Sequence, residues 1–227
     1  MAQIGVIIVA GGSGSRCGGG LPKQFQFLGQ QPLLVHTINR FAEALPEAEL
    51  VVVLPQAHID LWQNLSARFP VAKHSVVAGG TERFYSVQHG LEALSEGVTM
   101  IAVQDGVRPL GSVAMIQRVV ALAEQTGAAI PVVVPVDSFR TVSGEGSCPI
   151  DRNGLRVVQT PQVFRAEVLK AAYSVAFCPQ FTDDASVVEA QGHPIALAEG
   201  ERSNIKITTP EDFLLAQALL EAKQRDE

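Results

Sequence analysis

The sequence IGVIIVAGGSGSR, residues 4–16, indicates the fold class of this chain. Its first part, Ile4–Val9, is a short apolar run rich in β-branched residues, and it passes directly into a glycine-rich loop. Similar runs recur at residues 50–54, 74–77, 99–103 and 129–134. Because these runs are apolar throughout rather than alternating, we expect strands covered on both faces, as in a parallel sheet.

Helical periodicity occupies the intervals between these runs. Apolar residues recur at helical spacing around residues 34–45, 84–94 and 113–123, and further helices are expected at 168–177, at 183–190 and from a cap at Thr209 to about Lys223. A short strand is expected at 204–207. The alternation predicts an α/β fold of right-handed βαβ units: a mostly parallel sheet flanked by helices, with ligands at the carboxyl ends of the strands.

One segment interrupts this alternation. Residues 137–159 are polar, and Asn153-Gly154 before 155–158 is a hairpin signal, so we expect a projecting β-arm. A two-stranded ribbon is marginal on its own in water, which suggests a homodimer held through this arm. No repeat or linker divides the chain, so residues 1–227 are expected to form a single domain.

Composition limits the function classes. The chain has 227 residues, 47% hydrophobic and 18% charged, with a net charge of −6, which excludes disorder as the main state and gives no basic footprint for nucleic acid or a membrane. No apolar stretch approaches the roughly 20 residues of a membrane span, and no basic segment precedes the first apolar run. The three cysteines form no metal-binding or disulfide pattern, so a cytoplasmic protein is expected.

The loop after the first strand has the composition of a polyphosphate cradle. Its glycines permit close backbone approach to an anion, and its two cations neutralise phosphate oxygens. The candidate residues are Ala10, Gly11, Gly12 and Gly14, with Arg16 and Lys23. The dinucleotide fingerprint would need glycine at Cys17, and no Gly-Lys-Ser/Thr ends a P-loop, so neither of those cradles is supported. A flexible loop with solvated cations stays open as the alternative.

Two further loops carry candidates, each with a purely structural alternative. Gly79-Gly80 leads into an expected helix that carries Ser86, and this arrangement suits the binding of the edge of a nucleotide base. The structural alternative is a simple turn in which Thr81 caps the helix. Asp105 follows the fourth run, at the carboxyl end of the expected strand. There a carboxylate orients the water shell of a metal or accepts a hydrogen bond from a substrate hydroxyl. The structural alternative is an ion pair with Arg108 that braces the loop.

Two later candidates also have structural alternatives. Lys206 lies between two isoleucines and alternates to a solvent face in the simplest reading, while Thr182 is either a ligand or a helix cap.

Taken together, these segments resemble the 2-C-methyl-D-erythritol 4-phosphate cytidylyltransferase family. The resemblance covers essentially the whole chain, and its strength comes from seven segments in the same order. They are Ala10–Arg16 with Pro22–Gln24, Gly79–Arg83 with Ser86-Val87, Asp105–Pro109, Asp151–Leu155, Thr160–Gln162, Thr182–Ser186 and Asn204–Thr208. One departure is Gln104, which stands where family members commonly have His.

The resemblance implies a Rossmann-like nucleotidyltransferase, a homodimer that transfers CMP from CTP to 2-C-methyl-D-erythritol 4-phosphate and releases pyrophosphate. A divalent ion, usually Mg²⁺, would arrive with CTP, and no protein metal site is implied. The implied catalytic cations are Arg16, Lys23, Arg152 and Lys206. Cytosine would lie against Gly79, Gly80, Thr81 and Ser86, and the acceptor against Asp105, Arg108, Thr160 and Thr182, with Ser138 and Arg152 supplied by the partner subunit.

This chemistry needs positioning and cations rather than a side-chain nucleophile, because the attacking phosphate oxygen is already ionised near neutral pH. Two alternatives stay open at this point: a ribitol 5-phosphate cytidylyltransferase, which shares the fold and the chemistry, and a nucleotide-binding module without catalysis. Measuring pyrophosphate release with each acceptor distinguishes the ribitol 5-phosphate enzyme from the methylerythritol phosphate enzyme. Measuring whether CTP is consumed distinguishes an enzyme from a non-catalytic binding module.

Overall fold

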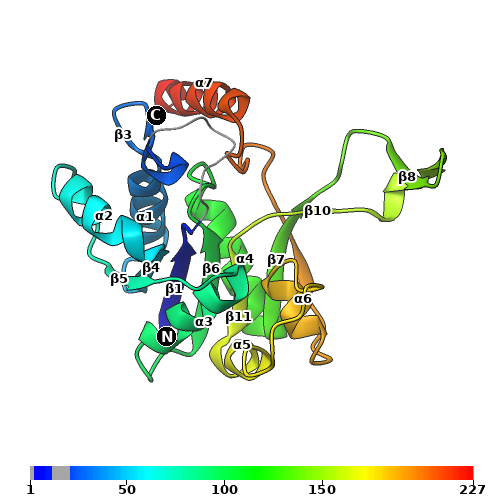
Figure 1. Cartoon of the computed structure of the whole chain (residues 1–227), viewed down its shortest axis with the longest axis horizontal. Helices are drawn as coiled ribbons and strands as arrows, with labels where there is room; N and C mark the ends of the chain where they lie inside the picture. The colour runs from blue at the N-terminus through cyan, green and yellow to red at the C-terminus, as the bar shows by residue number, and fades with distance from the viewer. Residues whose placement is uncertain (1–2, 12–20, 227) are drawn as a thin grey trace.

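A central sheet with helices against both faces organises the chain (Figure 1). A computed structural model describes residues 3–11 and 21–226. Within that part of the chain the main sheet has eight strands. In spatial order they are β10 (Val157–Val158), β7 (Ala128–Val133), β11 (Gln162–Arg165), β6 (Met100–Asp105), β1 (Ile4–Val9), β4 (Glu49–Leu54) and β5 (Ser75–Ala78), with β12 (Ala196–Glu199) paired to β7.

Most of this sheet is parallel, as predicted, but two strands are not. β1 pairs in parallel with β4 and β6, and β4 with β5. β11 runs antiparallel to both β6 and β7, and β10 antiparallel to β7. The prediction of a mostly parallel sheet is therefore confirmed, with β10 and β11 as its antiparallel strands. Here the chain returns from the arm directly into the sheet, and an antiparallel strand needs no helical crossover.

Helices cover the two faces of the sheet. The remaining elements are α1 (Leu33–Ala44), α2 (Ile59–Ser66), α3 (Arg83–Ala93), α4 (Val113–Thr126), α5 (Ala166–Ala172), α6 (Asp184–Glu189), α7 (Pro210–Asp226), the short pair β2 (Phe27–Leu28) and β3 (Gln31–Pro32), and the 3-10 helices η2 (Lys23–Phe25) and η3 (Gln56–His58). Successive residues of β1 show the two-sided burial: Val6 and Ile8 pack with α1, α2 and α4, and Ile7 packs with α3 and α5.

Several boundaries differ from the sequence expectation. α5 ends at Ala172, so the helix expected to reach 177 is shorter. The strand expected at 204–207 does not form: Ile207 donates one backbone hydrogen bond to the carbonyl of Val107 (3.0 Å), and the strand of this region is β12 instead. The predicted cap of α7 is confirmed, since Thr209 N donates to Asp212 Oδ2 (2.8 Å) and Asp212 N to Thr209 Oγ1 (3.3 Å).

A hairpin extends away from the main body of the chain (Figure 1). It consists of β8 (Phe139–Ser143) and β9 (Gly146–Ile150) and turns at Gly144, which has a φ of +56°. The turn predicted at Asn153-Gly154 is wrong: these residues lie in the 3-10 helix η4 (Arg152–Gly154), where Asp151 accepts a hydrogen bond from Asn153 N. The pair 157–158 joins the main sheet instead of the hairpin.

Among the described helices, none is both long enough and apolar enough to cross a bilayer.

Candidate active site

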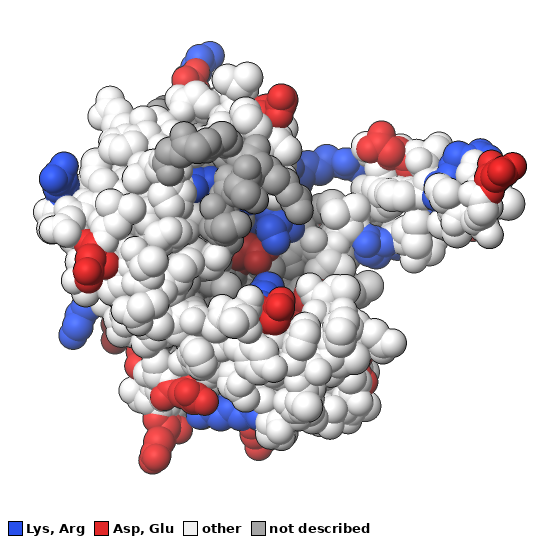
Figure 2. All heavy atoms as spheres, in the orientation of Figure 1, with Lys and Arg blue, Asp and Glu red and all other residues white. Residues whose placement is uncertain are grey.

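A cleft of about 270 Å³ opens at the carboxyl ends of β1 and β6. It is formed by the loop after β1, by η2, by the turn and first part of α3, and by the segment before α7. Figure 2 shows acidic and basic side chains meeting in a hollow near the centre of this face. Eight of the predicted site residues line the cleft: Ala10, Gly11, Lys23, Gly80, Thr81, Ser86, Asp105 and Lys206.

The Gly79-Gly80 turn approaches α3 too closely for side chains. A Cβ at Gly79 would lie 2.7 Å from Ser86 Oγ, and one at Gly80 would lie 2.3 Å from the Cβ of Tyr85. Gly80 N donates to Ser86 Oγ (3.2 Å), and that hydroxyl donates to the carbonyl of Glu82 (3.1 Å). The helix begins after Glu82, so the alternative in which Thr81 caps α3 is wrong. The turn and Ser86 form one hydrogen-bonded wall of the cleft.

Asp105 is the acidic centre of the cleft. Its Oδ2 lies 2.9 Å from Lys206 Nζ and 3.4 Å from Arg108 Nε, and its Oδ1 lies 3.6 Å from Arg83 Nε. Burial alone would raise the pKa of this carboxyl, but Arg83, Lys206 and Arg108 hold the pKa below its ordinary value. The carboxylate is therefore ionised at neutral pH and is surrounded by positive charge.

Backbone and side-chain bonds hold these groups in place. Thr160 Oγ1 accepts from Asp105 N (3.1 Å), and Arg108 Nη1 donates to the carbonyl of Asn204 (2.8 Å). Asn204 is fully buried and donates from Nδ2 to the carbonyl of Thr160 (2.9 Å). The pair of Asp105 with Arg108 does brace the loop, as the alternative predicted, but it is one of three ion pairs at Asp105. Lys206 reaches the cleft rather than only solvent.

The donor set of the cleft does not suit a protein-held metal. Both oxygens of Asp105 already face cations. Among residues 3–11 and 21–226, no cluster of three His, Cys, Asp or Glu side chains has the geometry to bind one. The expectation that Asp105 orients a metal's water shell is not supported by these surroundings.

Comparison with known proteins identifies the family. The family model described as 2-C-methyl-D-erythritol 4-phosphate cytidylyltransferase matches residues 4–222. The chain belongs to this cytidylyltransferase family. It is therefore an enzyme, and the predicted reaction, transfer of CMP from CTP to methylerythritol phosphate in isoprenoid precursor biosynthesis, is confirmed over the two alternatives.

Relatives and solved structures agree on this cytidylyltransferase family. The protein of that name from Bacteroides thetaiotaomicron is 48% identical over 216 residues, covering 95% of this chain and 98% of its own. That from Bacteroides fragilis is 46% identical, covering 94% and 98%. The crystal structure of the Thermus thermophilus cytidylyltransferase has a TM-score of 0.73 at 32% identity, covering 96% and 98%. The Rossmann-like nucleotidyltransferase fold is thereby confirmed.

Not every predicted residue of the cytidylyltransferase site lies in the cleft. Thr182 is exposed beside α6 and does not cap that helix, since Asp183 does so by accepting from Ser186 N (2.9 Å). Ser138 and Arg152 lie exposed on the arm, where Arg152 donates to the carbonyl of Val136. Gly12, Gly14 and Arg16 lie outside the described residues.

Five residues that line the cytidylyltransferase cleft were not predicted as site residues, and two of them, Gln24 and Arg83, make polar side-chain contacts there. Gln24 is buried and donates from Nε2 to the carbonyl of Ala10 (2.9 Å), which joins η2 to the loop after β1. Arg83 faces Asp105 from the start of α3. The available signal was position: Gln24 directly follows Lys23, and Arg83 lies three residues after Gly80.

Proposed function

We propose that CMP transfer takes place in this cleft, with the triphosphate of CTP on the loop after β1 and the acceptor beside Asp105. One observation carries the proposal. Lys23 and Lys206, from opposite ends of the sequence, line the same cleft as the ionised Asp105. A site that brings two phosphate groups together needs converging cations at fixed positions, because each approaching group is negative.

The reaction requires no covalent enzyme intermediate. An ionised oxygen of the acceptor phosphate attacks the α-phosphorus of CTP in line, and a new P–O bond forms. The bond from the α-phosphorus to the bridging oxygen breaks, and pyrophosphate leaves with the electron pair. Since a phosphate monoester loses its second proton with a pKa near 6, no side chain has to remove a proton at neutral pH.

Each group of residues has a proposed role. Lys23, with Arg16, stabilises charge on the α-phosphate, and Gly79, Gly80, Thr81 and Ser86 bind cytosine. The carboxylate of Asp105 accepts hydrogen bonds from acceptor hydroxyls, which are its natural donors once the ion pairs fix its position. The other acceptor ligands are Arg108, Thr160, Thr182 and Lys206, with Ser138 and Arg152 from a partner subunit.

Mg²⁺ enters this scheme as part of the substrate, bound to the phosphates of CTP. The surroundings of Asp105 favour this over a resident ion, since its two oxygens face three cationic side chains. The ion supplies charge neutralisation on the triphosphate, and the protein cations supply the rest.

The enzyme is further proposed to act as a homodimer through the 137–159 arm. The hairpin exposes apolar side chains on a two-stranded ribbon, with Val142 77% and Ile150 40% exposed. Such a ribbon gains stability by packing against another surface. Light scattering at micromolar concentration is expected to give the dimer mass, and a monomer mass overturns the proposal.

Subunit mixing tests whether the arm completes the partner's site. Lys23→Ala and Arg152→Ala are each expected to be nearly inactive as homodimers. In a mixed dimer, one site keeps Lys23 from its own chain and Arg152 from the partner, so random mixing restores about a quarter of the wild-type activity. If Arg152 acts only within its own subunit, every site contains one defect and mixing restores nothing.

The assigned acceptor is tested directly by pyrophosphate release from CTP. The enzyme is expected to release pyrophosphate with 2-C-methyl-D-erythritol 4-phosphate and Mg²⁺, and far more slowly with ribitol 5-phosphate. Equal rates with the two acceptors contradict the proposed specificity.

A cytoplasmic location is also proposed. The described cysteines, Cys148 and Cys178, are unpaired, as expected in a reducing compartment. Recovery of the native protein in the soluble cytosolic fraction tests this point.

A further inference from the structure

Arg83, the first residue of α3, is held by a carboxylate behind the cleft. Its Nη1 lies 2.9 Å from Asp184 Oδ1 and its Nη2 lies 2.7 Å from Asp184 Oδ2. Asp184 is fully buried, and its Oδ1 also accepts from the hydroxyl of Tyr173 (2.6 Å). Two parallel bonds fix both the position and the plane of a guanidinium group.

The opposite edge of the same guanidinium faces the cleft. Arg83 Nε lies 3.6 Å from Asp105 Oδ1, whereas Lys206 and Arg108 lie against Oδ2. Among the three ion pairs that Asp105 forms with described residues, the pair with Arg83 is the one made through Oδ1. Arg83 therefore connects the carboxylate at the end of β6 to the one at the start of α6.

We propose that Arg83 is a positioning residue: anchored by Asp184, it sets the orientation of the Asp105 carboxylate that binds the acceptor's hydroxyl groups. This inference rests on the proposed function, in which Asp105 binds the acceptor. With Oδ2 held by two cations and Oδ1 by a third, the carboxylate is fixed about its Cβ–Cγ bond. An acceptor hydroxyl then meets a carboxylate oriented before binding, which lowers the cost of ordering it.

Electrostatics support the same role. Burial alone would lower the pKa of Arg83, but Asp184 and Asp105 raise it, so the guanidinium stays charged between them. A lysine at this position keeps the charge but has no planar fork, so it cannot make the two-point bond to Asp184 and also face Asp105. Arg83→Lys therefore removes the geometry and keeps the charge.

The test is a double-mutant cycle read as Michaelis constants for the two substrates. Asp105→Asn is expected to raise the KM for methylerythritol phosphate by about 10- to 100-fold, the range of a hydrogen bond to a charged group. Arg83→Lys is expected to raise it about 10-fold and to change the KM for CTP less than about 2-fold. The double variant is expected to match Asp105→Asn alone, since both changes remove one interaction.

Arg165→Lys is the matched control. It makes the same replacement at an arginine at the other end of the sheet, and it is expected to leave both Michaelis constants unchanged.

The outcomes separate the two proposals. An unchanged acceptor KM in Asp105→Asn overturns the assigned role of Asp105, and with it the basis of this inference. A raised KM in Asp105→Asn together with an unchanged KM in Arg83→Lys, or with effects that multiply in the double variant, overturns the positioning role alone.

A folding defect does not block the test. A Michaelis constant is independent of the fraction of active enzyme, so partial unfolding lowers kcat but does not imitate the expected result. If Arg83→Lys gives no folded protein, Asp184→Asn replaces it in the cycle. That variant keeps the size of the side chain, removes the charge that anchors Arg83, and is expected to give the same selective rise in acceptor KM; its absence overturns the proposal.

Discussion

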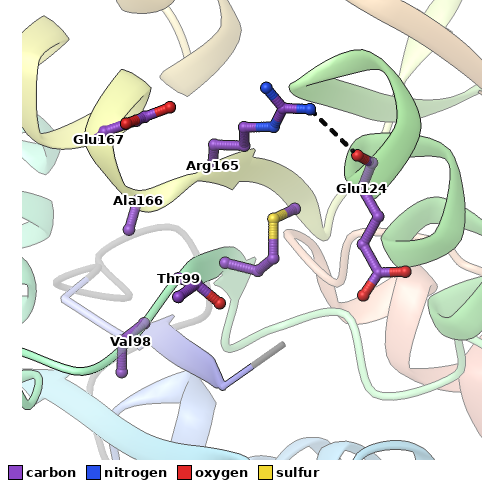
Figure 3. A pocket seen from close by; sticks show the side chains of 7 residues that line it. Val98, Thr99, Glu124, Arg165, Ala166 and Glu167 are labelled. Atoms are coloured by element: carbon purple, nitrogen blue, oxygen red, sulfur yellow. Dashed lines mark hydrogen bonds between the residues drawn. The ribbon is translucent and has the colours of Figure 1, made fainter. Parts of the chain in front are cut away.

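The two ends of β6 carry two cavities that differ in kind. At the carboxyl end lies the cleft of about 270 Å³, in which three cations surround Asp105. At the amino end, beside Met100, lies a wider pocket of about 540 Å³ (Figure 3). There Arg165 donates to the backbone carbonyl of Glu124 (3.3 Å), and the ion pairs of the described residues do not include it. The larger of these two cavities is thus lined by charged side chains, Glu124, Arg165 and Glu167, that form no ion pair with described residues.

Converging buried charge therefore marks the proposed reaction site better than cavity volume does. Burying ionic groups together is costly unless each is paired, so such a cluster persists in a fold only with compensating contacts. A pocket whose charged side chains are exposed carries no such cost. The topology agrees, because loops at the carboxyl ends of parallel strands diverge and leave room for ligands.

The largest effect is expected from Lys23→Ala, in the cleft at the carboxyl end of β6. Because its ammonium group is assigned to charge that develops in the transition state, we expect kcat to fall about 100- to 1,000-fold, roughly 3 to 4 kcal/mol. Steady-state pyrophosphate release measures it. Lys170→Ala, the same change at an exposed position of α5, serves as the control. Turnover close to wild type in Lys23→Ala would contradict the assignment of CMP transfer to this cleft.

Much of the cleft could be predicted from the sequence because its residues follow strands. Apolar runs gave the positions of β1 and β6, and the residues directly after a parallel strand lie at its carboxyl edge whatever the details of packing. That is why Gly11 and Asp105 were expected at this edge of the sheet, where both line the cleft. Lys23 was a candidate from the composition of the loop after the first strand, whereas the role of Lys206 came through the family resemblance, since it follows no strand of the main sheet.

The ion pair of Arg83 with Asp184 could not be predicted in this way. The two residues are 101 positions apart, and they meet only because the fold brings the first residue of α6 next to the first residue of α3. No local pattern carries that information. The same holds for the antiparallel β11, whose direction depends on how the chain returns from the arm. The hairpin turn was misplaced because Asn153-Gly154 satisfies a 3-10 helix capped by Asp151, while Gly144 takes the left-handed conformation.

The second prediction concerns the contribution of the Asp105 ion pairs to the free energy of unfolding. Asp105→Asn leaves three cations without their shared carboxylate, so the free energy of unfolding is expected to fall by about 1 to 3 kcal/mol at pH 7. The pKa of Asp105 is lowered in the folded protein, so its contribution is complete above the unfolded value near pH 4 and is lost as the pH falls through the folded value. Urea unfolding at several pH values measures both proteins.

The two stability curves are therefore expected to run parallel from pH 5 to 8 and to converge below pH 4. A gap that stays constant into acid would show that the charge of Asp105 does not stabilise the fold. Glu43→Gln is the control, because Glu43 forms an ion pair with Arg40 at the surface. Such a pair contributes less than about 1 kcal/mol to the free energy of unfolding.

The smallest effect is expected at the other end of β6. Arg165→Ala removes the arginine side chain that is labelled in Figure 3, together with its hydrogen bond to the backbone carbonyl of Glu124. Since that bond is exposed and no charge partner is left buried, we expect kcat and both Michaelis constants to stay within about 2-fold of wild type and the free energy of unfolding within about 0.5 kcal/mol. A selective loss of CMP transfer in this variant, with an unchanged melting temperature, would mean that the larger pocket takes part in the reaction and that charge clustering alone is not a sufficient guide to the site.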